Sequence, residues 1–167
     1  VDKKGQIDLE ELERAIRPDT ALVSMMYANN ETGTIFPIDK VAQIVKSHGV
    51  QLHVDAVQAV GKEAIDLKKL PIDYLAMSGH KLHAPKGIGA LYIKKGLNLP
   101  AYITGAGQEG GKRAGTEAMP QILAFGEACE SARVCFGEYH QRLKDLRAHA
   151  VERLEKGHSL MIFPEGT

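Results

Sequence analysis

The feature that most constrains the fold is a series of short apolar runs that alternate with helical segments. The runs at 21–28, 50–54 and 72–77 have no helical period and are bounded by turn residues, which is typical of buried β-strands. A fourth run at 87–93 ends at a Lys-Lys-Gly turn. Strands that alternate with helices indicate a mostly parallel sheet, so we expect an α/β fold with helices on both faces of the sheet.

Two helices are predicted, one before the first strand and one between the first and second strands. Asp8 is a suitable N-cap for a helix at 8–16, and Pro18 stops the apolar spacing that follows it. Pro37 opens a second helix, and Gly49 stands where the residue after a helix C-terminus is expected.

A long helical tract at 120–156 follows the fourth strand, with Gly137 as the expected break or bend. We expect residues 1–136 to form part of a large domain. Residues 137–167 are expected to contain helix and the truncated start of a small C-terminal domain, which includes the strand-like run at 161–163. The chain opens without a methionine, so we expect it to be part of a longer protein.

The composition excludes several classes of protein. The 167-residue chain has 21 basic and 21 acidic side chains, so no overall field favours nucleic acid or an anionic membrane. No apolar run approaches the roughly 20 residues that a membrane helix needs, and no leader pattern opens the chain. Cys129 and Cys135 lack metal-binding spacing. We expect a soluble cytoplasmic protein with two structural thiols and no metal site.

Polar side chains that suit one cofactor follow the strand ends. Lys81 comes just after the run at 72–77, where an unpaired buried ammonium would cost several kcal/mol and an imine with a carbonyl cofactor would not. Ligands collect beyond the carboxyl ends of parallel strands, so Lys81 is expected near Asp55. A lysine, a carboxylate, amides and hydroxyls are what pyridoxal phosphate needs. The other candidates at these ends are Asn30, Gln58, Ser78 and His80.

Each of these residues also has a plain structural interpretation. Asp55 alone is a strand-end cap or an ion-pair partner, and Asn30 alone is turn chemistry. His53 is expected to be a packed or hydrogen-bonded core histidine, and Lys81 alone is a surface lysine. Only the joint arrangement favours a cofactor site.

Residues 105–110 match the dinucleotide-binding pattern G-x-G-x-x-G, with 101–104 as the strand that would precede it. The helix that should follow at once is missing from the pattern, because a second glycine-rich stretch comes next and helix signals return only near Pro120. A nicotinamide-binding module is therefore the weaker hypothesis. The loop that ends at Thr116 fits better as a mobile phosphate-contacting or interface segment.

Four ordered motifs resemble the cysteine desulfurase family, the class V branch of fold-type-I pyridoxal phosphate enzymes. They lie at 27–34 (YANNETGT), 53–58 (HVDAVQ), 78–92 (SGHK followed by PKGIGALY) and 107–117 (GQE followed by RAGTE). They cover nearly the whole chain in the family's order and spacing. The resemblance implies part of that fold's large domain, with a long helix that leads toward the small domain.

The resemblance also implies residue roles. Lys81 would be the Schiff-base lysine and the catalytic residue of this segment, and Asp55 would contact the pyridine nitrogen. Gln58 and Asn30 would contact the ring oxygen or the substrate. Family members are homodimers, in which the threonine that matches Thr116 reaches the partner's cofactor phosphate. The remaining cofactor-binding positions would be Ser78, Gly79 and His80. Of these, Ser78 and His80 would lie at the phosphate.

Enzymes of this family convert L-cysteine to L-alanine and leave the sulfur as a persulfide on a catalytic cysteine. An acceptor or scaffold protein then takes it for iron–sulfur clusters or thiolated products. The family's nucleophilic cysteine loop matches positions beyond Thr167, and neither Cys129 nor Cys135 corresponds to it. We therefore expect a longer parent to be the enzyme and the isolated chain to be inactive. The alternatives are a selenocysteine lyase, an aminotransferase of the same class, or a non-catalytic fragment that serves in dimer or partner contact.

Overall fold

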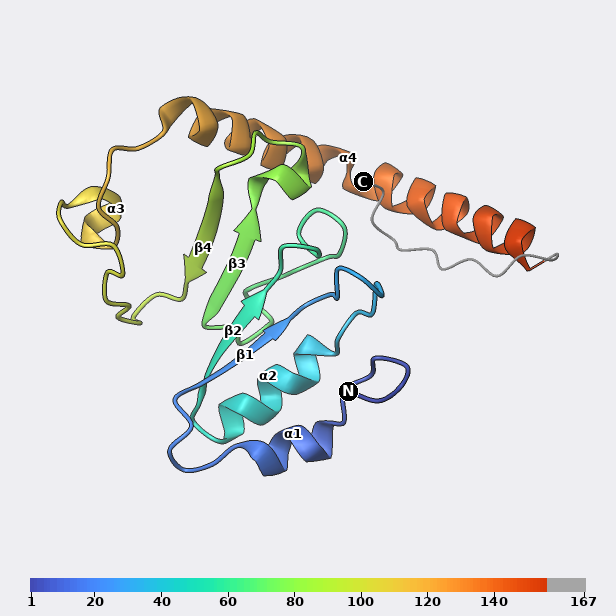
Figure 1. Ribbon diagram of the computed structural model, residues 1–167, viewed down its shortest axis with the longest axis horizontal. Helices are drawn as coiled ribbons and strands as arrows, with labels where there is room; N and C mark the ends of the chain where they lie inside the picture. The colour runs from blue at the N-terminus through green and yellow to red at the C-terminus, as the bar shows by residue number, and fades with distance from the viewer. Residues whose placement is uncertain (156–167) are drawn as a thin grey trace.

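A four-stranded sheet forms the centre of the molecule in the computed structural model, which describes residues 1–155 (Figure 1). The strands β1 (Leu22–Met26), β2 (Gln51–Asp55) and β3 (Tyr74–Ser78) are parallel neighbours, and β4 (Gly89–Ile93) pairs antiparallel with β3. Each of the four strands predicted between residues 21 and 93 is present, with its ends displaced by at most two residues. The expected α/β fold with a mostly parallel sheet is confirmed.

The helices are α1 (Leu9–Ala15), α2 (Ile38–Ser47), the single 3₁₀ turn η1 (Gly79–Leu82), the short α3 (Gln108–Gly111) and α4 (Met119–Leu154). Asp8 caps α1 as expected, because its carboxylate accepts hydrogen bonds from the backbone N–H groups of Glu10 and Glu11. These bonds hold the pKa of the Asp8 carboxyl below its usual range, and the bond from the Glu11 N–H has the largest effect.

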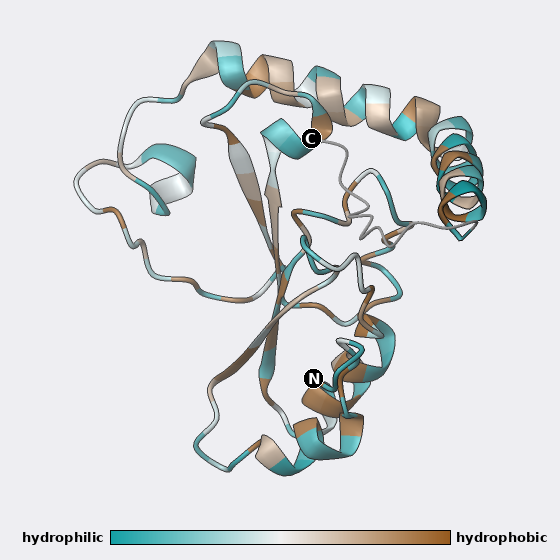
Figure 2. Ribbon diagram, turned by 45° about the vertical axis from the view of Figure 1, so that its right-hand side comes forward, coloured by the Kyte–Doolittle hydropathy of each residue, from teal (hydrophilic) through white to brown (hydrophobic). Residues whose placement is uncertain are grey.

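The hydrophobic core lies on one face of the sheet. Side chains of β2 and β3 pack there against α2. Helix α1 lies beside α2 (Figure 2). The fully buried members include Val41, Val45, Leu52, Val54 and Leu75. Leu52 and Val54 occupy alternate positions of β2, so they lie on the same face of that strand.

The opposite face of the sheet is more open than the sequence predicts. Leu22 and Leu91 are exposed on the edge strands, at 46% and 45% of their surface, and Ser24 is exposed as well. Within residues 1–155, α1 and α2 therefore cover only one face, and the expectation of a buried strand at 21–28 is wrong at Leu22 and Ser24. The apolar run alone could not distinguish an edge strand from a central one.

Helix α4 spans 36 residues and is not interrupted at Gly137, so of the expected break or bend the break does not occur. Its first half packs on η1, where Phe125 meets Leu82 and Ala84. Figures 1 and 2 show that the helix changes direction along its length. The small domain expected to begin in 137–167 involves residues 156–167, which lie outside the described residues.

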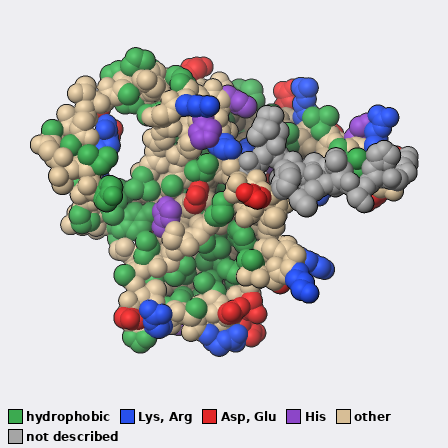
Figure 3. All heavy atoms as spheres, in the orientation of Figure 1, with side chains coloured by type: hydrophobic (Ala, Val, Ile, Leu, Met, Phe, Trp, Pro, Cys, Tyr) green, Lys and Arg blue, Asp and Glu red, His purple; other side chains and the backbone are tan. Residues whose placement is uncertain are grey.

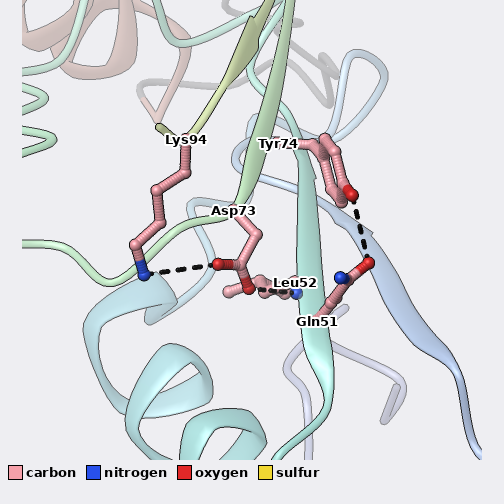
Figure 4. A network of polar contacts seen from close by, with 5 residues as sticks. All are labelled: Gln51, Leu52, Asp73, Tyr74 and Lys94. Atoms are coloured by element: carbon pink, nitrogen blue, oxygen red, sulfur yellow. Dashed lines mark hydrogen bonds and ion pairs between the residues drawn. The ribbon is translucent and has the colours of Figure 1, made fainter. Parts of the chain in front are cut away.

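One carboxylate ties three strands together at the edge where β2 and β3 begin (Figure 4). The Asp73 side chain accepts a hydrogen bond from the backbone N–H of Leu52 at 3.0 Å and lies 3.4 Å from the Lys94 ammonium. The Asp73 backbone bonds Leu52 and Lys94 as well, on β2 and just after β4. Asp73 thus extends the ladder by one position beyond the regular strand pairing.

Replacing Asp73 by alanine tests this role. The buried N–H of Leu52 would lose its acceptor, so the free energy of unfolding should fall by about 1–3 kcal/mol in denaturant titrations. Lys94→Met is the matched control, and should cost less than about 1 kcal/mol because the ion pair is partly exposed. Equal losses in the two variants would contradict the account.

Candidate functional site

The parallel register brings three strand ends to the same edge of the sheet. Met26 of β1 pairs with Asp55 of β2, and Asp55 pairs with Ala76 of β3. The chain then leaves β1 toward Asn30, leaves β2 at Asp55 itself, and enters η1 from Ser78. The segments that carry the predicted cofactor residues are therefore neighbours at this edge, as a parallel sheet requires.

Asp55 is half-buried and shapes the turn that follows β2. Its Oδ1 accepts a hydrogen bond from the backbone N–H of Val57 at 3.0 Å, which is the strand-end capping role expected of this residue alone. Among residues 1–155, the Asp55 carboxylate has no other hydrogen-bond donor. Its second oxygen is thus available to a ligand with a protonated nitrogen.

Gln58 lies on the helical turn after Asp55 and contacts a lysine that sequence reasoning did not single out. Its side-chain Oε1 accepts a hydrogen bond from Nζ of Lys62 at 3.2 Å. Backbone bonds from Lys62 and Glu63 to the carbonyl of Ala59 close the turn between them. The spacing of four residues within a helical turn could have indicated the Gln58–Lys62 contact.

The start of η1 is tightly constrained. The buried Gly79 donates its N–H to the carbonyl of Ile88 at 2.9 Å, which fastens η1 to the chain just before β4. Ser78 is extended, and its hydroxyl lies 2.8 Å from Nδ1 of His80. The Ser78 and His80 side chains are thus in contact, and their predicted role at a cofactor phosphate stays a prediction. Lys81 is half-buried on the same turn.

A cavity of about 440 Å³ lies between η1, the turn at 61–62 and α4. Lys81 and Lys62 both line it, together with Cys135 and Tyr139 of α4 and several small side chains. Asp55 and Gln58 are not among the described residues that line it. The cavity therefore adjoins the edge that carries Asp55 without including that carboxylate.

The two neighbouring asparagines in the loop after β1 have different environments. Asn29 accepts hydrogen bonds from the backbone N–H groups of Glu31 and Thr32, so it builds the turn. Asn30 is exposed. The turn interpretation thus applies to Asn29, and Asn30 is the one of the pair that faces outward.

The segment between β4 and α4 stands out from the body of the molecule and encloses an opening (Figure 3). Its exposed residues include Thr116. Residues 101–104 form no strand, and Glu109 and Gly110 in α3 have left-handed backbone angles. No strand precedes the motif, and the four-residue α3 is too short and too distorted to be the helix that a dinucleotide-binding motif needs, which contradicts the nicotinamide hypothesis. The expected role of this loop as an interface or phosphate-contacting segment stays a prediction.

Three further side chains, those of His53, Cys129 and Cys135, agree only in part with the predictions made from the sequence. His53 is hydrogen-bonded as expected, and its partner at 2.8 Å is the hydroxyl of Ser24 on the open face of the sheet. Cys129 packs against the Leu82 cluster, and burial raises the pKa of its thiol. Cys135 is exposed, so only the half-buried Cys129 has the packing contacts expected of a structural thiol.

The chemistry of these donors fits pyridoxal phosphate. The edge offers a carboxylate with one uncommitted oxygen, an amide, a serine–histidine pair and a half-buried lysine, all on segments that follow adjacent parallel strands. No three His, Cys, Asp or Glu side chains within 1–155 are grouped as a metal site would need. Over the same residues, no helix is both long enough and apolar enough to cross a membrane.

Comparison with known proteins gives a consistent family assignment. The family model described as Aminotransferase class-V matches residues 1–165. "Cysteine desulfurase 2" of Trichormus variabilis is 53% identical over 159 residues, which is 94% of this chain and 38% of that protein. "Cysteine desulfurase NifS" of Azotobacter vinelandii is 46% identical over 157 residues, again 94% of this chain and 38% of the relative. The chain thus spans about two fifths of the relatives that it matches.

Solved structures agree with the fold. A structure described as "NIFS-LIKE PROTEIN" superposes with a TM-score of 0.90 at 44% identity, over 93% of this chain and 43% of that one. Another, described as "SspA in complex with cysteine", gives a TM-score of 0.74 at 42% identity, over 76% of this chain and 37% of that one. The sheet and the long helix described above are therefore part of the architecture of these larger chains.

Gly79 offers a test of the packing that shapes this edge. A Cβ at Gly79 would lie 2.7 Å from Cγ2 of Ile88 and 3.2 Å from Cβ of Ala84. Gly79→Ala should therefore lower the free energy of unfolding by about 1–3 kcal/mol. In Gly126→Ala, on the exposed side of α4, the new Cβ meets no described atom within 4 Å, and stability should rise by about 0.5–1 kcal/mol. A stable Gly79→Ala variant would refute the close packing.

Proposed function

The chain belongs to the aminotransferase class-V family, and from that premise we propose that it is the core of a cysteine desulfurase that uses pyridoxal 5′-phosphate. The observation that carries the proposal is the parallel register of β1, β2 and β3, because it sets the segments of Asn30, Asp55 and Lys81 side by side. The names of the similar proteins support the choice of reaction within the family.

In this proposal Asp55 and Lys81 have complementary tasks. When bound, pyridoxal phosphate supplies an electron-withdrawing pyridinium ring that stabilises negative charge on the substrate carbon next to the amine. The uncommitted carboxylate oxygen of Asp55 would favour the protonated form of the ring nitrogen. The Lys81 amine would hold the cofactor through its aldehyde, and the same amine would serve as the proton acceptor and donor beside the substrate.

The surrounding residues orient the cofactor. The Gln58 and Asn30 amides contact its ring oxygen or the substrate. Ser78, Gly79 and His80 bind near its phosphate, and the short Ser78–His80 contact supports a shared role for these two side chains. Thr116, on the projecting loop, reaches the phosphate of a second subunit in a homodimer.

The substrate in this proposal is L-cysteine, and its sulfur goes to an acceptor or scaffold protein. The structural neighbour described as a complex with cysteine supports this substrate. Because the chain spans about two fifths of its relatives, these activities belong to the longer protein of which such a core would be part. The division into a large domain at 1–136 and the start of a small domain at 137–167 is part of the same proposal.

Covalent labelling tests the role of Lys81. The complete gene product loaded with pyridoxal phosphate should absorb visible light, and borohydride should bleach that absorbance and fix the cofactor to the peptide that contains Lys81. Lys81→Ala should abolish the label, whereas Lys86→Ala, at an exposed lysine nearby, should retain it. A label on any other lysine would refute the assignment.

Steady-state assays test the reaction and the role of Asp55. The complete gene product should release alanine from L-cysteine, and Asp55→Asn should slow this by about 10²–10³-fold because a fixed charge beside the ring is lost. Asp66→Asn, at an exposed loop carboxylate, should leave the rate unchanged. Transfer of an amino group to a keto acid, or activity with selenocysteine alone, would instead favour the other class V enzymes.

A further inference from the structure

A histidine of α4 holds the turn that carries Gln58, although it lies far away in the sequence. Nδ1 of His140 lies 2.9 Å from the backbone carbonyl oxygen of Lys62. A carbonyl can only accept, so Nδ1 carries the proton in this contact. The His140 ring also stacks on Phe136 one helical turn earlier, with ring centroids 5.6 Å apart and an interplanar angle of 15°. Two contacts therefore fix the orientation of the imidazole.

Lys62 joins this histidine to the candidate cofactor residue. Its carbonyl accepts from His140, and its ammonium donates to Oε1 of Gln58 at 3.2 Å. Lys62 makes one contact through its backbone and the other through its side chain. A shift of the Lys62 backbone therefore also moves the ammonium that contacts Gln58. The contact with His140 is partly buried. Its two residues are 78 positions apart in the sequence, so it is a tertiary contact rather than a local one.

Close packing leaves the backbone before Lys62 little freedom. Gly61 has a φ of +79°, and a Cβ there would lie 2.5 Å from Cδ2 of Leu82 and 3.5 Å from Cβ of Ala132. The turn is therefore confined between η1, which carries Lys81, and α4. Only glycine combines the left-handed conformation with this approach.

We propose that His140 is a positioning residue that acts through Lys62 on Gln58, so that α4 sets the place of the amide beside the cofactor. This inference rests on the proposed function, since it concerns the contact of Gln58 with the cofactor ring oxygen or the substrate. It goes beyond that function by giving α4 a defined influence on the site. His140 itself touches neither cofactor nor substrate.

The test uses the complete gene product, with and without pyridoxal phosphate. Variants are His140→Ala, which removes the donor, His140→Gln, which retains an N–H donor, and Lys62→Met, which keeps the length of the side chain and removes its ammonium. His149→Ala is the matched control, because His149 is an exposed histidine on the same helix. Gln58→Ala gives the reference for complete loss of the amide.

Two readouts separate positioning from general stability. Without cofactor, His140→Ala should raise hydrogen exchange several-fold at the amides of Lys62 and Glu63, which close the turn. With cofactor, it should raise the Kd of pyridoxal phosphate about three- to tenfold and shift the visible absorbance in the direction seen for Gln58→Ala. Lys62→Met should shift the absorbance in the same way, and the double variant with His140→Ala should be less than additive. His140→Gln should restore most of the affinity, and His149→Ala should match the wild type.

Increased exchange with unchanged affinity and absorbance would overturn the inference, because His140 would then only stabilise the fold. Additive effects of the two variants would overturn it as well, since the residues would act separately. Failure of the wild-type protein to bind pyridoxal phosphate would be seen before any variant is compared. That result would refute the proposed function and this inference together, whereas the first two refute the inference alone.

Discussion

The parallel pairing of β1, β2 and β3 is the constraint on which the rest of the structure depends. It aligns the carboxyl ends of three strands, so that residues distant in the sequence come to one edge of the sheet. The buried face supplies the apolar contacts that hold this register, because a shift by one residue would expose Leu52, Val54 and Leu75. Packing on one face thus determines which polar groups gather at the edge.

The turn at 56–63 connects this edge to the remainder of the molecule. It begins at Asp55, carries Gln58, and ends where η1 and α4 confine Gly61. At the opposite edge, Asp73 ties the beginnings of the strands and so limits how far the sheet can shift. Asp55, Gln58 and Lys81 therefore lie on short, well-anchored segments, as a site that must hold a ring in one orientation requires.

Much of this arrangement could be predicted from the sequence, and the misses have physical causes. Strand and helix positions follow from apolar period and capping, and the order of polar residues at strand ends follows from parallel topology. Exposure of the edge strand at Leu22 could not be predicted, because burial depends on which element packs on each face. The contact of His140 with Lys62 was also missed, since no local pattern encodes a hydrogen bond across 78 residues. The roles of the individual site residues remain predictions.

The most direct measurement is a crystal structure of the complete gene product grown with pyridoxal phosphate. The account predicts that one cofactor molecule is joined to Nζ of Lys81 while its pyridine nitrogen lies within hydrogen-bond distance of the Asp55 carboxylate. A cofactor attached to another lysine, or a ring nitrogen turned away from Asp55 toward the cavity beside α4, would contradict it.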